Sequence, residues 1–186
     1  MAETPTGKFK TTVSYFLKNI CEILLDMIDD GEKISISVQA VRIASNIIER
    51  YDGTKLINNF IDTHKDWKHV KTKNITYLTQ TIPETYKSVP FDTKVLTTPV
   101  EKFEIWKAQG HHNGDTDTSN WPVTSDDIED YWGYVRAMIK ISCDHVHMSR
   151  KPVVQDGVIR YRNKDMYKDF PLEVYTSMFD VILTIT

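Results

Sequence analysis

Three metal-binding side-chain types stand close together near the end of the sequence. Cys143, His145 and His147 alternate along the chain, and on a helix Cys143 and His147 would lie one turn apart on the same face, as zinc ligands often do. A complete zinc site needs further ligands, and the pair His111 and His112 is the obvious supply. The competing interpretation needs no cofactor: a buried cysteine, with histidines at the negative end of the helix dipole. We favour it and keep zinc as the alternative.

Two basic segments contain aromatic residues. The first segment comprises Lys65, Trp67, Lys68, Lys71 and Lys73, and the second contains Arg160 and Arg162 around a tyrosine. Cationic side chains bind phosphate and aromatic rings stack on bases, so two such patches side by side would form a nucleic-acid surface. The net charge of -3 and the pI near 6.1 weigh against this interpretation, and lysine-rich turns are commonly solvated helix ends.

Motifs of the common enzyme families do not occur in the chain. We find no glycine-rich phosphate or dinucleotide loop, no His-Glu-x-x-His and no Gly-x-Ser-x-Gly. Cys143 lies late in an expected helix, whereas a nucleophilic cysteine is usually found at a helix start or an exposed turn. The sequence therefore predicts a protein that is not an enzyme.

The first part of the chain, residues 8–81, has the apolar spacing of a small helical bundle. Apolar residues recur every three or four positions, which predicts amphipathic helices joined by short connections. Glycines after acidic residues end the first two helices. The expected helices are 9–28, a second from Ser35 or Ser37 to Tyr51, a third capped by Thr54 and reaching Trp67, and a short fourth capped by Asn74.

Residues 82–123 form a middle part that prolines interrupt, and we expect a mostly irregular path there. The prolines are Pro83, Pro90, Pro99 and Pro122. Within this part, Thr98 to Glu101 has capping-box spacing, which predicts a short helix ending at Gly110. That helix should bury Val100, Phe103 and Trp106. Trp121 lies in a polar loop beside a proline, where we favour packing back onto the helices and keep contact with a partner as the alternative.

The last part, residues 124–186, contains the clearest helix pattern. Thr124 or Ser125 can cap this helix, which should be the central core helix. Its apolar stripe is Ile128, Tyr131, Trp132, Val135, Met138, Ile139, Ser142 and Val146. An Asp156-Gly157 pair between extended segments predicts a β-hairpin lying on the helices. A final helix is expected over 171–182, and 181–186 fits a helix end or a strand equally well.

These patterns predict one compact, mainly α-helical domain of five to seven helices over residues 1–186, with a long irregular middle and one hairpin near the C-terminus. Neither a signal segment nor a bilayer-length apolar run occurs, and two cysteines without a spacing partner predict no disulfide, so we expect an intracellular, cytoplasmic protein without a membrane role. We expect an interaction or structural protein that contacts a protein partner through 82–123 or the basic hairpin. Self-association is the alternative assembly.

Four short segments also carry a resemblance. They are 56–61 leading to Trp67, 103–106, Tyr131-Trp132 and 150–153. In their spacing they resemble uncharacterised small helical proteins encoded by large double-stranded DNA viruses, over roughly residues 36–153, and the bias toward lysine, isoleucine and asparagine agrees. The resemblance implies a viral accessory or virion protein whose role is binding rather than catalysis.

Overall fold

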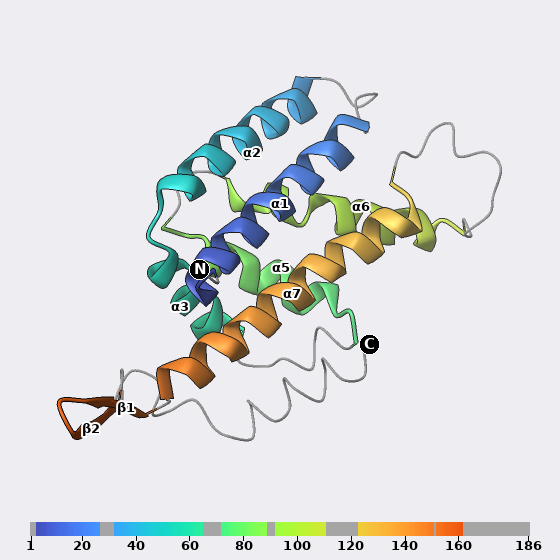
Figure 1. Cartoon of the computed structure of the whole chain (residues 1–186). Coiled ribbons are helices and arrows are strands. Elements are labelled where there is room, and N and C mark those ends of the chain that lie inside the picture. The colour runs from blue at the N-terminus through green and yellow to red at the C-terminus, as the bar shows by residue number, and fades with distance from the viewer. Residues whose placement is uncertain are drawn as a thin grey trace.

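Helices make up most of the described chain (Figure 1). The computed structural model describes residues 3–26, 32–64, 72–88, 92–110, 123–150 and 152–161. Its elements are α1 (Pro5–Asp26), α2 (Glu32–Arg50), α3 (Gly53–Thr63), α5 (Ile75–Thr85), the 3₁₀ turn η2 (Thr93–Leu96), α6 (Thr98–Ala108), α7 (Ser125–Arg150), β1 (Pro152–Gln155) and β2 (Val158–Tyr161). The predicted mainly α-helical fold is confirmed. None of the described helices is long and apolar enough to cross a membrane.

Helix α1 lies at the centre of the arrangement. Helices α2 and α7 run beside it on either side and antiparallel to it (Figure 1). Its inward face buries aromatic and aliphatic side chains, and the ring centroid of Phe16 lies 5.0 Å from that of Tyr131 on α7. The apolar period read from the sequence therefore identifies the packed face. The helix begins at Pro5, earlier than the predicted residue 9, because proline fits the first helical position.

Helix α7 is the core helix that the sequence predicts, and every residue of its predicted stripe is buried. Thr124 Oγ1 accepts a hydrogen bond from the Asp127 amide at 3.2 Å, while Asp127 Oδ2 accepts one from the Thr124 amide at 2.8 Å. This reciprocal cap satisfies two amides at the helix start. The buried Tyr131 hydroxyl donates to the Leu96 carbonyl at 2.9 Å, which ties η2 to α7.

The sequence predicts the N-cap residue of α5 correctly and that of α3 incorrectly. Asn74 caps α5 as predicted, since its Oδ1 accepts from the Tyr77 amide at 3.0 Å. The predicted Thr54 cap of α3 is wrong, because Asp52 accepts from the Thr54 amide at 2.9 Å and takes the cap position two residues earlier. Helix α2 likewise starts at Glu32, before the two predicted serines.

Helix α3 ends at Thr63 and does not continue to Trp67 as predicted, because His64 leaves the helical conformation. A polar cluster joins this helix end to α5. The Thr63 and Thr85 hydroxyls lie 2.6 Å apart. His64 Nδ1 lies 3.1 Å from the Thr63 hydroxyl, and the His64 ring stacks on Phe60 at 4.1 Å between centroids. These contacts join the end of α3 to the end of α5.

The middle part is more helical than the sequence indicates. Helix α5 continues through Pro83 to Thr85, which corrects the expectation of an irregular path from residue 82. Proline removes one amide donor near the helix end, and the buried Ile82 and Tyr86 hold that last turn by packing. The predicted short helix is α6, with its three core residues buried as expected. Its N-cap is Thr97, whose side chain makes no cap hydrogen bond, so the predicted Thr98 capping box is wrong.

The predicted hairpin forms from β1 and β2, with Val154 paired to Ile159. Asp156 and Gly157 adopt φ of 53° and 73°, as the tight turn requires. The hairpin extends past the end of α7 (Figure 1), and Val154 and Val158 are 72% and 53% exposed. The expectation that it lies on the helices is therefore not met by these described residues. The final predicted helix over 171–182 and the 181–186 alternative lie outside the described residues.

Candidate partner-binding groove

A surface groove of about 710 Å³ lies between the turn that precedes α5, helix α6 and the first two turns of α7. We call it the α5–α7 groove. Its apolar lining comes from Phe103 on α6 and from Ile128 and Trp132 on α7, all of which are buried. Its charged lining consists of Lys73, Glu104, Lys107 and Glu129. The groove thus combines an aromatic floor with a charged, exposed rim.

Spacing along α7 places the floor and the rim side by side. Ile128 and Trp132 are four residues apart and share a face, while Glu129 is turned toward the neighbouring, exposed side. Helix α6 repeats this arrangement with a buried Phe103 beside an exposed Glu104. Each helix therefore contributes one aromatic side chain to the floor and one carboxylate to the rim.

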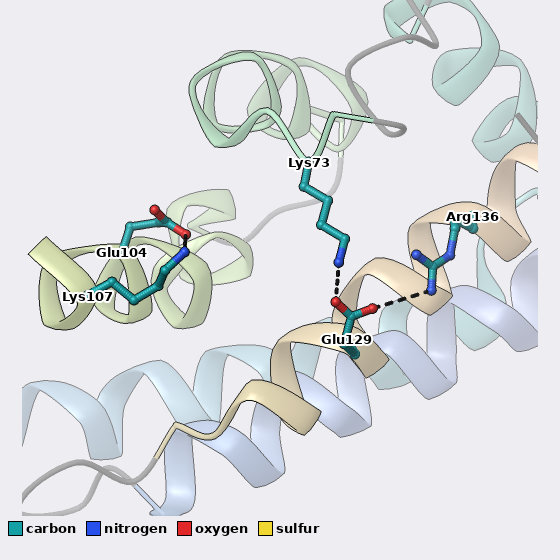
Figure 2. Close-up of polar contacts among 5 residues, drawn as sticks. All are labelled: Lys73, Glu104, Lys107, Glu129 and Arg136. Carbon is teal, nitrogen blue, oxygen red and sulfur yellow. Dashed lines mark hydrogen bonds and ion pairs between the residues drawn. The ribbon is translucent and has the colours of Figure 1, made fainter. Parts of the chain in front are cut away.

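Two cations hold Glu129. Lys73 extends from the turn before α5 to one carboxylate oxygen of Glu129, as Figure 2 shows, and Arg136 Nη2 lies 3.9 Å from the other oxygen. Glu129 and Arg136 are seven residues apart and lie on the same face of α7. Lys73 and Glu129, by contrast, are separated by 56 residues, so their contact joins two distant parts of the chain across the groove.

A second ion pair lies on α6. Lys107 Nζ is 3.5 Å from Glu104 Oε1 and 5.6 Å from the ring centroid of Phe103 (Figure 2 shows the pair). The ammonium group is therefore close enough for a cation–π contact with the floor. Lys107 borders the aromatic surface and still exposes its charge.

Lys73 has an unusual backbone. Its φ is 50°, in the left-handed region that non-glycine residues seldom adopt. Glycine or asparagine would fit this position with less strain. A lysine held there, with its ammonium on the rim of a groove, is the kind of strained residue that often marks a functional site.

The residues of the predicted zinc site lie in different environments. Cys143 is buried in the core, and burial together with the nearby Asp144 carboxylate raises the pKa of its thiol to about 12. Burial lowers the pKa of His145, and His147 lies at an exposed position on α7. Among the residues that the structure describes, no group of three or more metal-binding side chains is close enough to hold an ion. His111 and His112 lie outside this part of the chain.

The two predicted basic patches are not brought together at their described positions. Lys73 contacts the first turns of α7, whereas Arg160 lies in β2, beyond the other end of that helix (Figure 1). At 1.5 Å per residue, Glu129 and the end of α7 are roughly 30 Å apart. The other predicted contact residues lie outside the described residues: Lys65, Trp67, Lys68, Lys71, Trp121 and Arg162.

The groove lies where two of the predicted contact segments join the described chain. Residues 65–71 lead into Thr72, which lines the groove. Residues 111–122 lead into Val123, two residues before Ser125, which also lines it. These stretches contain candidate contact residues named from the sequence, among them Lys71 and Trp121.

Sequence reasoning identified only part of this site. The sequence indicates Lys73 by its charge and predicts that Phe103 and Trp132 lie in the core, where both are buried. The spacing of Glu104 and Lys107 could have indicated their ion pair, since residues three apart on a helix are neighbours. No local pattern indicates that Lys73 meets Glu129.

A second groove, of about 510 Å³, lies between α1 and α2. Its apolar lining residues are Leu17, Cys21, Leu25 and Val41, and its charged ones are Lys18, Glu22 and Arg42. Its described lining residues include no aromatic side chain, so this groove serves as a comparison for the α5–α7 groove.

Comparison of the chain with protein-family models, with curated proteins and with solved structures found no match.

Proposed function

We propose that this chain is a non-enzymatic interaction protein that binds a segment of a partner protein in the α5–α7 groove. The observation that carries the proposal is the pairing of a buried aromatic floor with exposed charged side chains around it. Protein interfaces have this anatomy, in which aromatic anchors occupy a dry centre and polar groups surround it. The volume of about 710 Å³ is enough for a few side chains of a bound segment.

The chemistry of the lining supports binding rather than catalysis. A nucleophilic site pairs a hydroxyl or thiol with a neighbouring base, most often histidine. The described lining residues of the groove include no histidine and no cysteine. Its charged side chains instead form ion pairs with one another, which is an arrangement that a charged partner can rearrange.

A protein partner fits the groove better than a nucleic acid does. The described lining of the groove has two lysines and two glutamates, and the chain has a net charge of -3, so this lining offers no extended positive surface for a phosphate backbone. The sequence resemblance to helical proteins of large DNA viruses would make the chain a viral accessory or virion protein, and a groove for a partner segment agrees with such a role.

Selection from a displayed random-peptide library tests the proposal. The wild-type protein is the bait, and a Ser125→Trp variant, which places an indole in the groove, is used for counter-selection after its folding has been checked by circular dichroism. We expect peptides that bind the wild type and lose at least tenfold in affinity for Ser125→Trp. Peptides that bind both proteins equally, or no enrichment at all, would refute a binding role for this groove.

A further inference from the structure

We infer that the α5–α7 groove recognises an acidic segment, in which a carboxylate of the partner takes the place of Glu129 on Lys73 and an apolar side chain lies on the Phe103–Trp132 floor. This inference rests on the proposed function and adds the chemistry of the partner.

The ion pairs around the groove contain more cations than carboxylates. Lys73 and Arg136 share Glu129, and Lys107 has Glu104, so three cations face two carboxylates. One further carboxylate from a partner would give every cation its own partner: Lys73 with the ligand, Arg136 with Glu129 and Lys107 with Glu104. A basic segment would instead have to remove a glutamate from cations that already hold it.

A partner carboxylate can replace Glu129 on Lys73 because the Lys73–Glu129 ion pair is exposed to solvent. The Lys73 and Glu129 side chains are 43% and 53% exposed, and an ion pair with that exposure contributes little to stability. Arg136 is only 24% exposed and stays beside Glu129 on the same helix. Glu129 therefore keeps a compensating charge when Lys73 leaves it, and no carboxylate is left unpaired.

The aspartates in the first turns of α7 do not line the groove, so they do not repel a carboxylate bound at Lys73 from within it. Asp126, Asp127 and Asp130 are not among its lining residues, and the Asp127 carboxylate accepts hydrogen bonds from Thr124. Lys107 stays paired with Glu104 and lies next to the floor. The partner segment that fits these groups has an acidic residue for Lys73 and a neighbouring apolar side chain for the floor.

Two pools of synthetic twelve-residue peptides test the inference. One pool combines Asp and Glu with apolar and aromatic residues, and the other has Lys and Arg at the same positions. Binding is measured by fluorescence anisotropy at about 50 mM and about 300 mM salt. We expect the acidic pool to bind, and to bind less tightly at the higher salt concentration because the new ion pairs are screened. We expect the basic pool not to bind.

Three variants separate recognition from folding. Lys73→Gln should weaken binding of the acidic pool about tenfold, and Glu129→Gln should strengthen it because the internal competitor for Lys73 is removed. Lys87→Gln is the control, since Lys87 has a similar exposed ion pair, with Glu84, outside the groove. The inference would be wrong if basic or neutral peptides bound in the groove and Lys73→Gln did not change their affinity. That result would leave the proposed function standing. Failure of both pools together with the displayed library would overturn both.

Discussion

Replacing Lys73 by asparagine should remove recognition of an acidic segment without weakening the fold. A lysine at φ 50° carries roughly 1 kcal/mol of backbone strain, and asparagine tolerates this conformation better. The lost ion pair with Glu129 is exposed and contributes about 0.2 to 1 kcal/mol. The two effects oppose each other, so the free energy of unfolding should stay the same or rise by up to about 0.8 kcal/mol.

Urea denaturation measures this balance, because urea does not screen charges. The matched control is Lys87→Asn: Lys87 has a 2.9 Å ion pair with Glu84, and no positive φ that asparagine could relieve. Lys87→Asn should therefore lower the free energy of unfolding by the contribution of one exposed ion pair, about 0.2 to 1 kcal/mol, with no compensating relief of backbone strain. A loss of more than about 1 kcal/mol for Lys73→Asn alone would show that Lys73 and Glu129 clamp the fold, and the exchange argument would fail.

Three further predictions concern the fold that positions the groove. Thr124→Ala should lower the free energy of unfolding by about 1 kcal/mol in urea, because it removes the cap of α7. Phe60→Ala should lower it by about 3 to 5 kcal/mol, since Phe60 is buried against Phe9. Stability should fall as the pH rises above about 9, because burial raises the pKa of Cys143 to about 12 and also raises those of Tyr86 and Tyr131. The unfolded chain releases these protons at a lower pH than the native state does, so the free energy of unfolding decreases as the pH rises.

Controls for these predictions come from positions outside the buried core. Thr79→Ala removes a hydroxyl that donates to the Thr76 carbonyl within α5, and Ile105→Ala removes an exposed side chain of α6, so each should change stability by less than about 0.5 kcal/mol. An equal loss for Thr79→Ala and Thr124→Ala would argue against the cap. A Phe60→Ala variant as stable as Ile105→Ala would contradict the packing described for α3. Stability that stayed constant from pH 8 to 11 would contradict the burial of the thiol and the two phenols.

Local patterns predict the elements of this fold, and contacts between distant residues determine the site. The apolar period identifies the buried faces of α1 and α7, because packing and helix geometry impose the same spacing. The sequence does not distinguish Asp52 from Thr54 as the cap of α3, since both residue types cap well and lie two positions apart. Pro83 remains helical only because its neighbours are buried, which a local rule does not take into account.

The groove has no local signature. Phe103 and Trp132 belong to two helices, and the sequence shows only that each is apolar on a buried face. The pairing of Lys73 with Glu129 depends on how the turn before α5 packs near α7. Residue type makes Lys73 a candidate contact residue, but its ion-pair partner follows from the fold alone.

The most direct test is a titration of the ¹⁵N-labelled wild-type protein with the tightest selected acidic peptide, followed by amide chemical shifts. The account predicts that the largest shifts occur at Thr72 to Ile75, at Glu104 to Lys107 and at Ser125 to Trp132, with little change along the α1–α2 groove. Largest shifts along the α1–α2 groove or on the hairpin would contradict it.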